Sequence, residues 1–158
     1  MLMEIIKTRT IKQSVNFEAP PHEVYEALID SKKHSAFTGD KAVISRKVSG
    51  KFSVFSRYLY GINIRLIKDK QIVQKWTCTD FPEGHYTKVT FSLAKTKKGT
   101  KLLFTQTEVP IENYNSISKG WHEYYWFPMN KMFEAESQKK HLKTLLFSEL
   151  ILVSYGCI

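Results

Sequence analysis

Cysteine is scarce in this sequence, and long apolar runs are absent. The two cysteines, Cys78 and Cys157, lie far apart and neither has metal-type spacing around it. Two cysteines do not make a disulfide framework, so reduced thiols are the simplest interpretation. No apolar run is long enough to span a membrane, and the start of the chain lacks the apolar core and small-residue cleavage site of a signal peptide. These absences predict a cytoplasmic protein with no membrane span.

Catalytic and metal-binding motifs are also missing. The sequence has no G-x-S-x-G elbow and no phosphate-binding P-loop. The histidines show no H-x-x-H or H-E-x-x-H pattern and no carboxylate at metal-site spacing; they are His22, His34, His85, His122 and His141. We interpret each as a hydrogen-bonded core residue or a surface residue. The sequence therefore predicts no enzyme, no metal and no cofactor.

What is present fits one globular unit. The chain has 158 residues, of which 42% are hydrophobic and 13% aromatic. A chain of this size can bury a sizeable core, and its composition is that of an ordered protein. We expect residues 1–158 to form a single domain, with a core at about 9–133 and a carboxy-terminal extension at 134–158.

The positive charge is concentrated in the middle of the chain. The net charge is +9, and residues 41–101 hold fourteen Lys/Arg against three acids, a local balance of +11. On alternating strands these basic side chains would occupy the solvated face and protect sheet edges from aggregation. The alternative is a surface for an acidic partner. Nucleic acid is not expected, because no recognisable reading element accompanies the charge.

The apolar pattern predicts strands first and a long helix last. Residues 10–17 alternate as a strand, and short helices follow at 22–30 and at 31–37, the second with Ser31 as N-cap. Strands are expected at 41–47, 51–55, 57–67 with a bulge at Gly61, 71–79, 86–95 and 100–109. A helix should begin at 112–115, kink at Pro128 and pass Phe133. This order predicts an α+β helix-grip fold, in which a curved antiparallel sheet wraps around the long helix.

One face of that helix is aromatic. Apolar groups recur at helical spacing, at Ile117, Trp121, Tyr124, Tyr125, Pro128 and Met132. Since successive helical residues lie about 100° apart, Trp126 or Phe127 should point away from the sheet.

Three strand faces that are otherwise apolar each carry a glutamine: Gln13, Gln74 and Gln106. If these faces look at the helix, their amides would project among aromatic walls, as in a small-molecule site. We predict a cavity between sheet and helix lined by Gln13, Gln74, Trp76, Phe104, Gln106, Trp121, Tyr124 and Tyr125. Alternatively, the amides bond one another, the backbone or trapped water inside a filled core.

The extension at 134–158 is rich in leucine. Leu142, Leu145, Leu146, Leu150 and Val153 share a helical face, whereas Phe147, Ile151 and Leu152 lie off it. We expect a packed helical extension, because exposed apolar patches of this size are uncommon in monomers. The alternative is an apolar surface that binds a partner, and both a monomer and a homodimer remain open.

Several segments resemble one family. They are APPHEVYEALIDSKKHSAFTG at 19–39, KFS at 51–53, GIN at 61–63, IVQKW at 72–76, FPEGHY at 81–86, TKLLFTQ at 100–106, VP at 109–110 and GWHEYYW at 120–126. In this order they resemble the heat-shock-protein-90 ATPase-activator C-terminal domain family, over about residues 9–133. The resemblance implies a START-like domain, in a superfamily that commonly holds apolar ligands. The eukaryotic co-chaperones of the family carry a separate amino-terminal domain with a principal chaperone contact, which we do not expect here.

The expected function is therefore binding. The first hypothesis is a non-enzymatic protein that holds an apolar or aromatic small molecule between sheet and helix. The alternative is a stress-related, co-chaperone-like module that contacts a heat-shock-protein-90-type chaperone through its basic strand surface.

Overall fold

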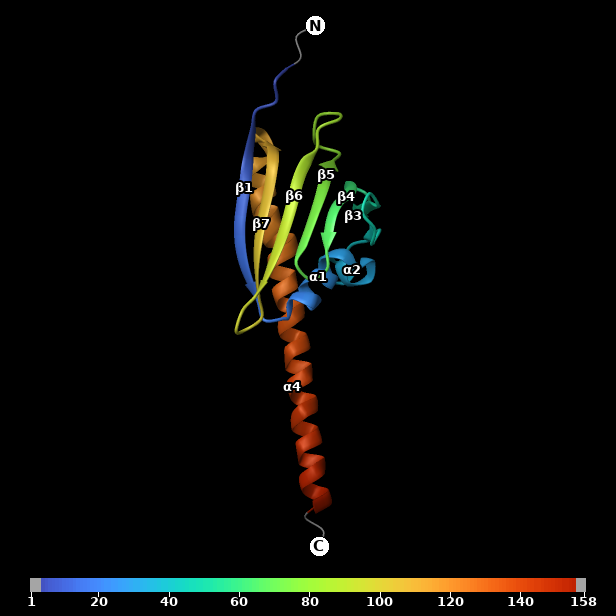
Figure 1. The fold of residues 1–158 in the computed structure, drawn as a ribbon, viewed down its shortest axis with the longest axis vertical. Coiled ribbons are helices and arrows are strands. Elements are labelled where there is room, and N and C mark those ends of the chain that lie inside the picture. Colours follow the sequence, from blue (N-terminus) through green and yellow to red (C-terminus); the bar gives the residue numbers. More distant parts are fainter. Residues whose placement is uncertain (1–3, 156–158) are drawn as a thin grey trace.

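A seven-stranded antiparallel sheet and a long helical run behind it form the protein (Figure 1). The computed structural model describes residues 4–155. The sheet order is β1-β7-β6-β5-β4-β3-β2. The elements are β1 Thr8–Phe17, α1 Pro21–Ile29, α2 Ser31–Thr38, β2 Val43–Ile44, β3 Lys51–Val54, β4 Leu59–Ile67, β5 Gln71–Cys78, β6 Thr87–Lys95, β7 Thr100–Pro110, η1 Ile111–Asn113, α3 Tyr114–Trp121, a π-helical turn η2 His122–Trp126, and α4 Phe127–Tyr155. The predicted helix-grip fold is confirmed.

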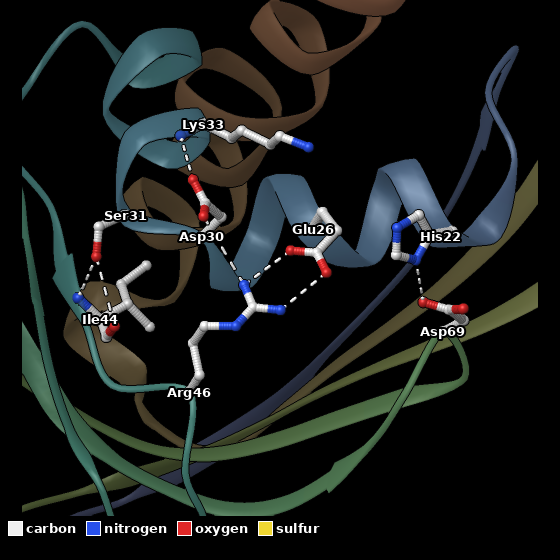
Figure 2. A network of polar contacts seen from close by, with 8 residues as sticks. All are labelled: His22, Glu26, Asp30, Ser31, Lys33, Ile44, Arg46 and Asp69. Carbon is white, nitrogen blue, oxygen red and sulfur yellow. Dashed lines mark hydrogen bonds and ion pairs between the residues drawn. The ribbon is translucent and has the colours of Figure 1, made fainter.

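The two short helices are separated by Asp30. Pro21 occupies the first turn of α1, where its missing N–H costs nothing. Asp30 ends α1 and caps α2, because its Oδ1 accepts from the Lys33 N–H at 3.0 Å (Figure 2). The prediction that Ser31 caps α2 was wrong. The Ser31 hydroxyl instead accepts from the Ile44 N–H at 2.8 Å and so ties α2 to β2.

The predicted strand at 41–47 shrinks to Val43–Ile44. The side chain of Asn63 explains why, since its Nδ2 donates to the carbonyls of Ser45 and Lys47 at 2.7 and 3.0 Å. Those carbonyls are thereby diverted from the ladder. A side-chain amide that competes for these carbonyls cannot be predicted from the alternation of apolar and polar residues.

The bulge in β4 lies at a different place from the prediction. Gly61 pairs regularly with Phe52 and Trp76, and the register shifts between Asn63 and Arg65 instead. Gly61 is needed for another reason: a Cβ there would lie 1.7 Å from the Lys75 carbonyl oxygen. The glycine permits close strand approach rather than a bulge.

The helical run changes its hydrogen-bond spacing just before Pro128. In η2 the Phe127 N–H donates to the His122 carbonyl, a five-residue step. Pro128 has no N–H to continue the α-helical ladder, so an irregular turn at this position has a direct cause. Trp126 is buried and Phe127 is exposed. Of the two residues predicted as candidates to point away from the sheet, Phe127 is the one that does.

The prediction of a packed carboxy-terminal extension was wrong. Every residue from 134 to 155 is exposed, and α4 projects beyond the sheet as a single helix (Figure 1). Phe133 is the last buried residue of α4. Beyond it, Lys140 Nζ reaches back to Glu23 of α1 at 2.9 Å. The helix α4 continues past the end of the sheet (Figure 1), so its projecting part has no sheet surface to pack against. Cys157 lies outside the described residues.

No helix in the described part of the chain combines the length and the apolar character needed to cross a membrane.

Candidate functional site

Each of the three predicted glutamines accepts a hydrogen bond from a tryptophan indole. Trp76 Nε1 donates to Gln74 Oε1 at 2.8 Å, and Trp121 Nε1 donates to Gln106 Oε1 at 2.8 Å. The third bond runs from Trp126 Nε1 to Gln13 Oε1 at 2.7 Å. These are all the tryptophans of the chain. Two of these bonds, from Trp121 and Trp126, join the helical run to β7 and β1 inside an aromatic core, whereas the bond from Trp76 lies within β5.

The other end of each amide is also occupied. Gln74 Nε2 donates to Asn63 Oδ1 at 2.9 Å and Gln106 Nε2 to Thr87 Oγ1 at 3.0 Å. Gln13 Nε2 donates to the Ser118 carbonyl at 2.9 Å. Buried amides require partners, and these have them within the protein. This arrangement agrees with the alternative prediction, in which the amides form hydrogen bonds inside a filled core.

A pocket of about 200 Å³ nevertheless lies beside this core. It opens between α3, η2 and the carboxy-terminal end of β5, and its lining residues are Phe55, Tyr58, Leu59, Trp76, Thr77, Cys78, Phe81, Gln106, Ser116, Ile117, Gly120, Trp121, Tyr124 and Tyr125. Five of the eight predicted cavity residues are brought together here: Trp76, Gln106, Trp121, Tyr124 and Tyr125. The other three, Gln13, Gln74 and Phe104, do not line it. The pocket walls are mostly apolar, as small-molecule sites require.

The pocket wall includes two weakly acidic groups that are held neutral. Burial raises the pKa of the Cys78 thiol. A hydrogen bond from the Tyr58 hydroxyl to Asp80 raises the pKa of Tyr58. A protonated, buried thiol is a poor nucleophile. The pocket therefore presents an uncharged surface.

Behind the pocket, Tyr125 contacts a buried histidine. The Tyr125 hydroxyl lies 3.0 Å from His34 Nε2, and His34 Nδ1 has no hydrogen-bond partner within residues 4–155. Burial lowers the pKa of His34 to about 4, so the ring is neutral at pH 7. Burial also raises the pKa of Tyr125. Sequence reasoning grouped His34 with the other histidines, although its three-residue spacing from the apolar Phe37 in α2 was a usable signal.

The outer face of the sheet has a different character. Across neighbouring strands, Lys51 lies opposite Ile62, Ile62 opposite Lys75, and Lys75 opposite Lys88. The seven strands together contain eight Lys/Arg and one carboxylate, that of Glu108. None of these eight basic groups forms an ion pair within residues 4–155. The prediction that the charge lies on the solvated strand face is confirmed for Lys51, Lys75 and Lys88.

Exposed apolar groups are interspersed with these lysines. Tyr60, Ile62, Tyr86 and Leu103 are all more than one third exposed. Lys75 Nζ lies 5.1 Å from the centroid of the Tyr86 ring. We use the term basic face for the outward side chains of β3–β7 around Lys51, Lys75 and Lys88.

The best-formed ion pairs lie elsewhere, between α1 and the segment that follows β2 (Figure 2). Arg46 donates to both carboxylate oxygens of Glu26, at 2.7 and 2.8 Å. This bond lowers the pKa of Glu26 and raises that of Arg46. On the same helix, His22 Nδ1 lies 2.8 Å from Asp69. These contacts fasten α1 over the sheet.

Residues 4–155 contain no group of three or more His, Cys, Asp or Glu side chains that could hold a metal ion.

Comparison with known proteins identifies the family. A family model described as "Activator of Hsp90 ATPase homolog 1-like protein" matches residues 18–143. The chain belongs to this family, which confirms the resemblance drawn from the sequence motifs.

Two curated relatives show the extent of the similarity. The human "Activator of 90 kDa heat shock protein ATPase homolog 1" is 27% identical over 128 residues, which cover 81% of this chain and 38% of the human protein. The Dictyostelium discoideum "Activator of 90 kDa heat shock protein ATPase homolog" is 28% identical over 115 residues, covering 72% of this chain and 30% of that protein. The chain thus spans less than two fifths of the length of these curated relatives.

Solved structures agree with the fold. The crystal structure of an HSP90 activator from Plasmodium falciparum has a TM-score of 0.73 and 26% identity, covering 78% of this chain and 94% of that one. The solution structure of the Aha1 dimer from Colwellia psychrerythraea has a TM-score of 0.70 at 16% identity, covering 80% of this chain and 96% of that one. The second similarity shows the fold alone.

Proposed function

We propose that this chain is a non-enzymatic, co-chaperone-like domain that binds an Hsp90-type chaperone through its basic face. The observation that carries the proposal is the eight-to-one excess of basic over acidic groups in the seven strands, with none of these basic groups in an ion pair among the residues that the structure describes. Membership of the Hsp90-activator-like family supplies the class of partner. The proposal is limited to binding, because the chain covers only part of its curated relatives.

The arrangement of charge favours an acidic partner over a solvation role alone. Lys75 and Lys88 are direct cross-strand neighbours, and like charges in this position destabilise a sheet. A partner carboxylate between them would relieve the repulsion. Aromatic and aliphatic groups among the lysines add the apolar contact area that protein interfaces use. Charge-complementary surfaces of this kind steer association and make it sensitive to salt.

The test is a binding measurement with a purified Hsp90-type chaperone, using titration calorimetry at low and moderate salt. Lys75→Gln/Lys88→Gln should weaken binding by about tenfold, since each solvent-exposed charge contact contributes on the order of 0.7 kcal/mol. The matched control, Lys139→Gln/Lys143→Gln, removes the same charge from α4 and should leave the affinity unchanged. Equal affinities for the wild type and both variants at low salt would overturn the proposal.

A second candidate function is supported by the pocket of about 200 Å³ that contains Trp76, Trp121 and Tyr125. An uncharged, aromatic-walled pocket suits an apolar or aromatic small molecule. Native mass spectrometry on protein isolated gently from its own cells tests this. An adduct that departs on denaturation, and that an Ile117→Trp variant lacks, would support the candidate. Bare protein in both samples would contradict it.

A further inference from the structure

The last three turns of α4 are exposed and apolar. In residues 145–155, eight of eleven side chains are large and hydrophobic, and the only charged group is Glu149. Leu150, Leu152 and Val153 are each about 70% exposed. Large contiguous apolar surface of this kind is rare on a protein in water and marks a binding surface.

The apolar side chains surround the helix and do not form one stripe. At about 100° per residue, Leu146 and Ile151 lie about 140° apart around the axis. A second copy packed as a coiled coil would cover a single seam and leave the other side in water. Helices that are hydrophobic all round belong in the interior of a large protein or in a bilayer.

A cluster of basic residues comes directly before the apolar segment. Lys139, Lys140 and Lys143 lie within five residues, together with His141. Lys140 contacts Glu23, and the other two lysines form no ion pair within the described residues. Lysines next to a membrane-embedded segment attract anionic lipid headgroups. Each such lysine raises the partition of the protein onto the membrane by on the order of fivefold.

The position and length of the segment fit a bilayer surface. The helix α4 carries it away from the domain, so the sheet does not obstruct the approach of a membrane (Figure 1). Eleven helical residues extend about 16 Å, roughly half of the ~30 Å hydrocarbon thickness. The described segment is therefore long enough to enter one leaflet. The family match ends at residue 143, so residues 145–155 lie outside it.

We propose that residues 145–155 insert into one leaflet of an anionic lipid bilayer, with Lys139 and Lys143 at the headgroups. The proposal does not depend on chaperone binding. It gives the domain a means of attachment to a membrane surface, with the basic face of the sheet left free.

Vesicle flotation of the full chain tests the proposal, with phosphatidylcholine vesicles compared with phosphatidylcholine/phosphatidylserine vesicles. We expect the protein to float with the mixed vesicles and much less with the neutral ones. Lys139→Gln/Lys143→Gln should lower partition by about 25-fold at two fivefold steps, whereas Lys75→Gln/Lys88→Gln should change it far less. Glu149→Gln should raise partition severalfold, because a buried carboxylate opposes insertion.

Two single substitutions distinguish a bilayer from a second copy. Insertion buries the whole circumference, so Leu146→Asn and Ile151→Asn should weaken flotation alike. In a coiled-coil dimer only one of the two positions would lie in the seam. Only that substitution would then weaken dimerisation, measured by sedimentation velocity without lipid. Both positions are exposed, so neither change should disturb the domain. Protein that stays unbound with anionic vesicles, or a dimer that lipid does not dissociate, would overturn the proposal.

Discussion

At the scale of single residues, the amide of Gln74 is placed between two groups that have no other described partner. It accepts from Trp76 Nε1 and donates to Asn63 Oδ1. Gln74→Leu would leave both groups buried and unpaired, at a cost of about 1–3 kcal/mol. We expect a corresponding loss in the free energy of unfolding measured with urea.

Gln71 is the matched control on the same strand. It is only half-buried and bonds Ser92 Oγ at 3.2 Å. Gln71→Leu should change stability by less than about 0.5 kcal/mol. A Gln74→Leu protein as stable as the wild type would show that the indole and amide bonds add nothing to the folded state.

His34 makes stability depend on pH. Its pKa is about 4 in the folded protein and 6.5 in the unfolded chain, because burial disfavours the charged ring. Between these values the unfolded chain binds more protons, so stability is complete above pH 6.5 and falls as the pH drops toward 4. The loss at pH 4 should reach about 3 kcal/mol from this group. Urea titrations at several pH values measure it.

The control for this prediction is another histidine. His141 is exposed on α4, so His141→Gln should keep the full pH slope. His34→Gln should lower stability at pH 7 but flatten the slope between pH 6.5 and 4. An unchanged slope in the His34 variant would assign the pH dependence to other groups.

At the scale of elements, substituting alanine for each of two glycines should change stability in opposite directions. Gly61→Ala would place its Cβ 1.7 Å from the Lys75 carbonyl oxygen, so β4 and β5 must separate. We expect a loss of roughly 2–4 kcal/mol. In α3, a Cβ at Gly120 would meet only Tyr124 Cδ2, at 3.7 Å. Gly120→Ala should therefore stabilise the protein by up to about 1 kcal/mol.

Thermal unfolding of the two alanine variants checks this pair. A lower Tm for Gly61→Ala and a higher one for Gly120→Ala are expected. A Gly61→Ala protein with wild-type Tm would mean that the two strands separate at no cost.

The elements also show what the sequence can and cannot predict. Strand alternation and helical spacing report local burial, so they located β1 and β5 to β7 and the helical run with small errors at the ends. They failed where a side chain competes with the ladder, as Asn63 does beside β2. They also failed for residues 134–155, because an apolar pattern does not show whether the apolar side chains pack against the same chain or remain exposed.

The sequence predicted the direction of the side chains at the candidate site but not their contacts. Alternation placed Gln13, Gln74 and Gln106 on inward faces, which is correct. Whether an amide meets a ligand or an indole depends on contacts between residues up to 113 positions apart. No local pattern contains that information.

At the scale of the whole molecule, the domain and the projecting part of α4 should differ in stability. Residues 134–155 have only exposed side chains, and a helix without tertiary support is marginal in water. In hydrogen exchange, amides of 145–155 should exchange rapidly while those of β5 to β7 are protected. Anionic vesicles should slow exchange in 145–155 alone. Strong protection there without lipid would show that another surface already covers the segment.

The tryptophans give the molecule a selective optical signal. All three lie in the core, and the rings of Trp121 and Trp126 are stacked with centroids 5.5 Å apart at 20°. Neighbouring indoles at this separation couple electronically and should mark the folded core in circular dichroism. Their emission will follow the loss of the indole–glutamine bonds on unfolding. Since residues 134–155 contain no tryptophan, the same signal will be silent when the end of α4 frays or enters a lipid surface, and the two events can be recorded separately in one sample.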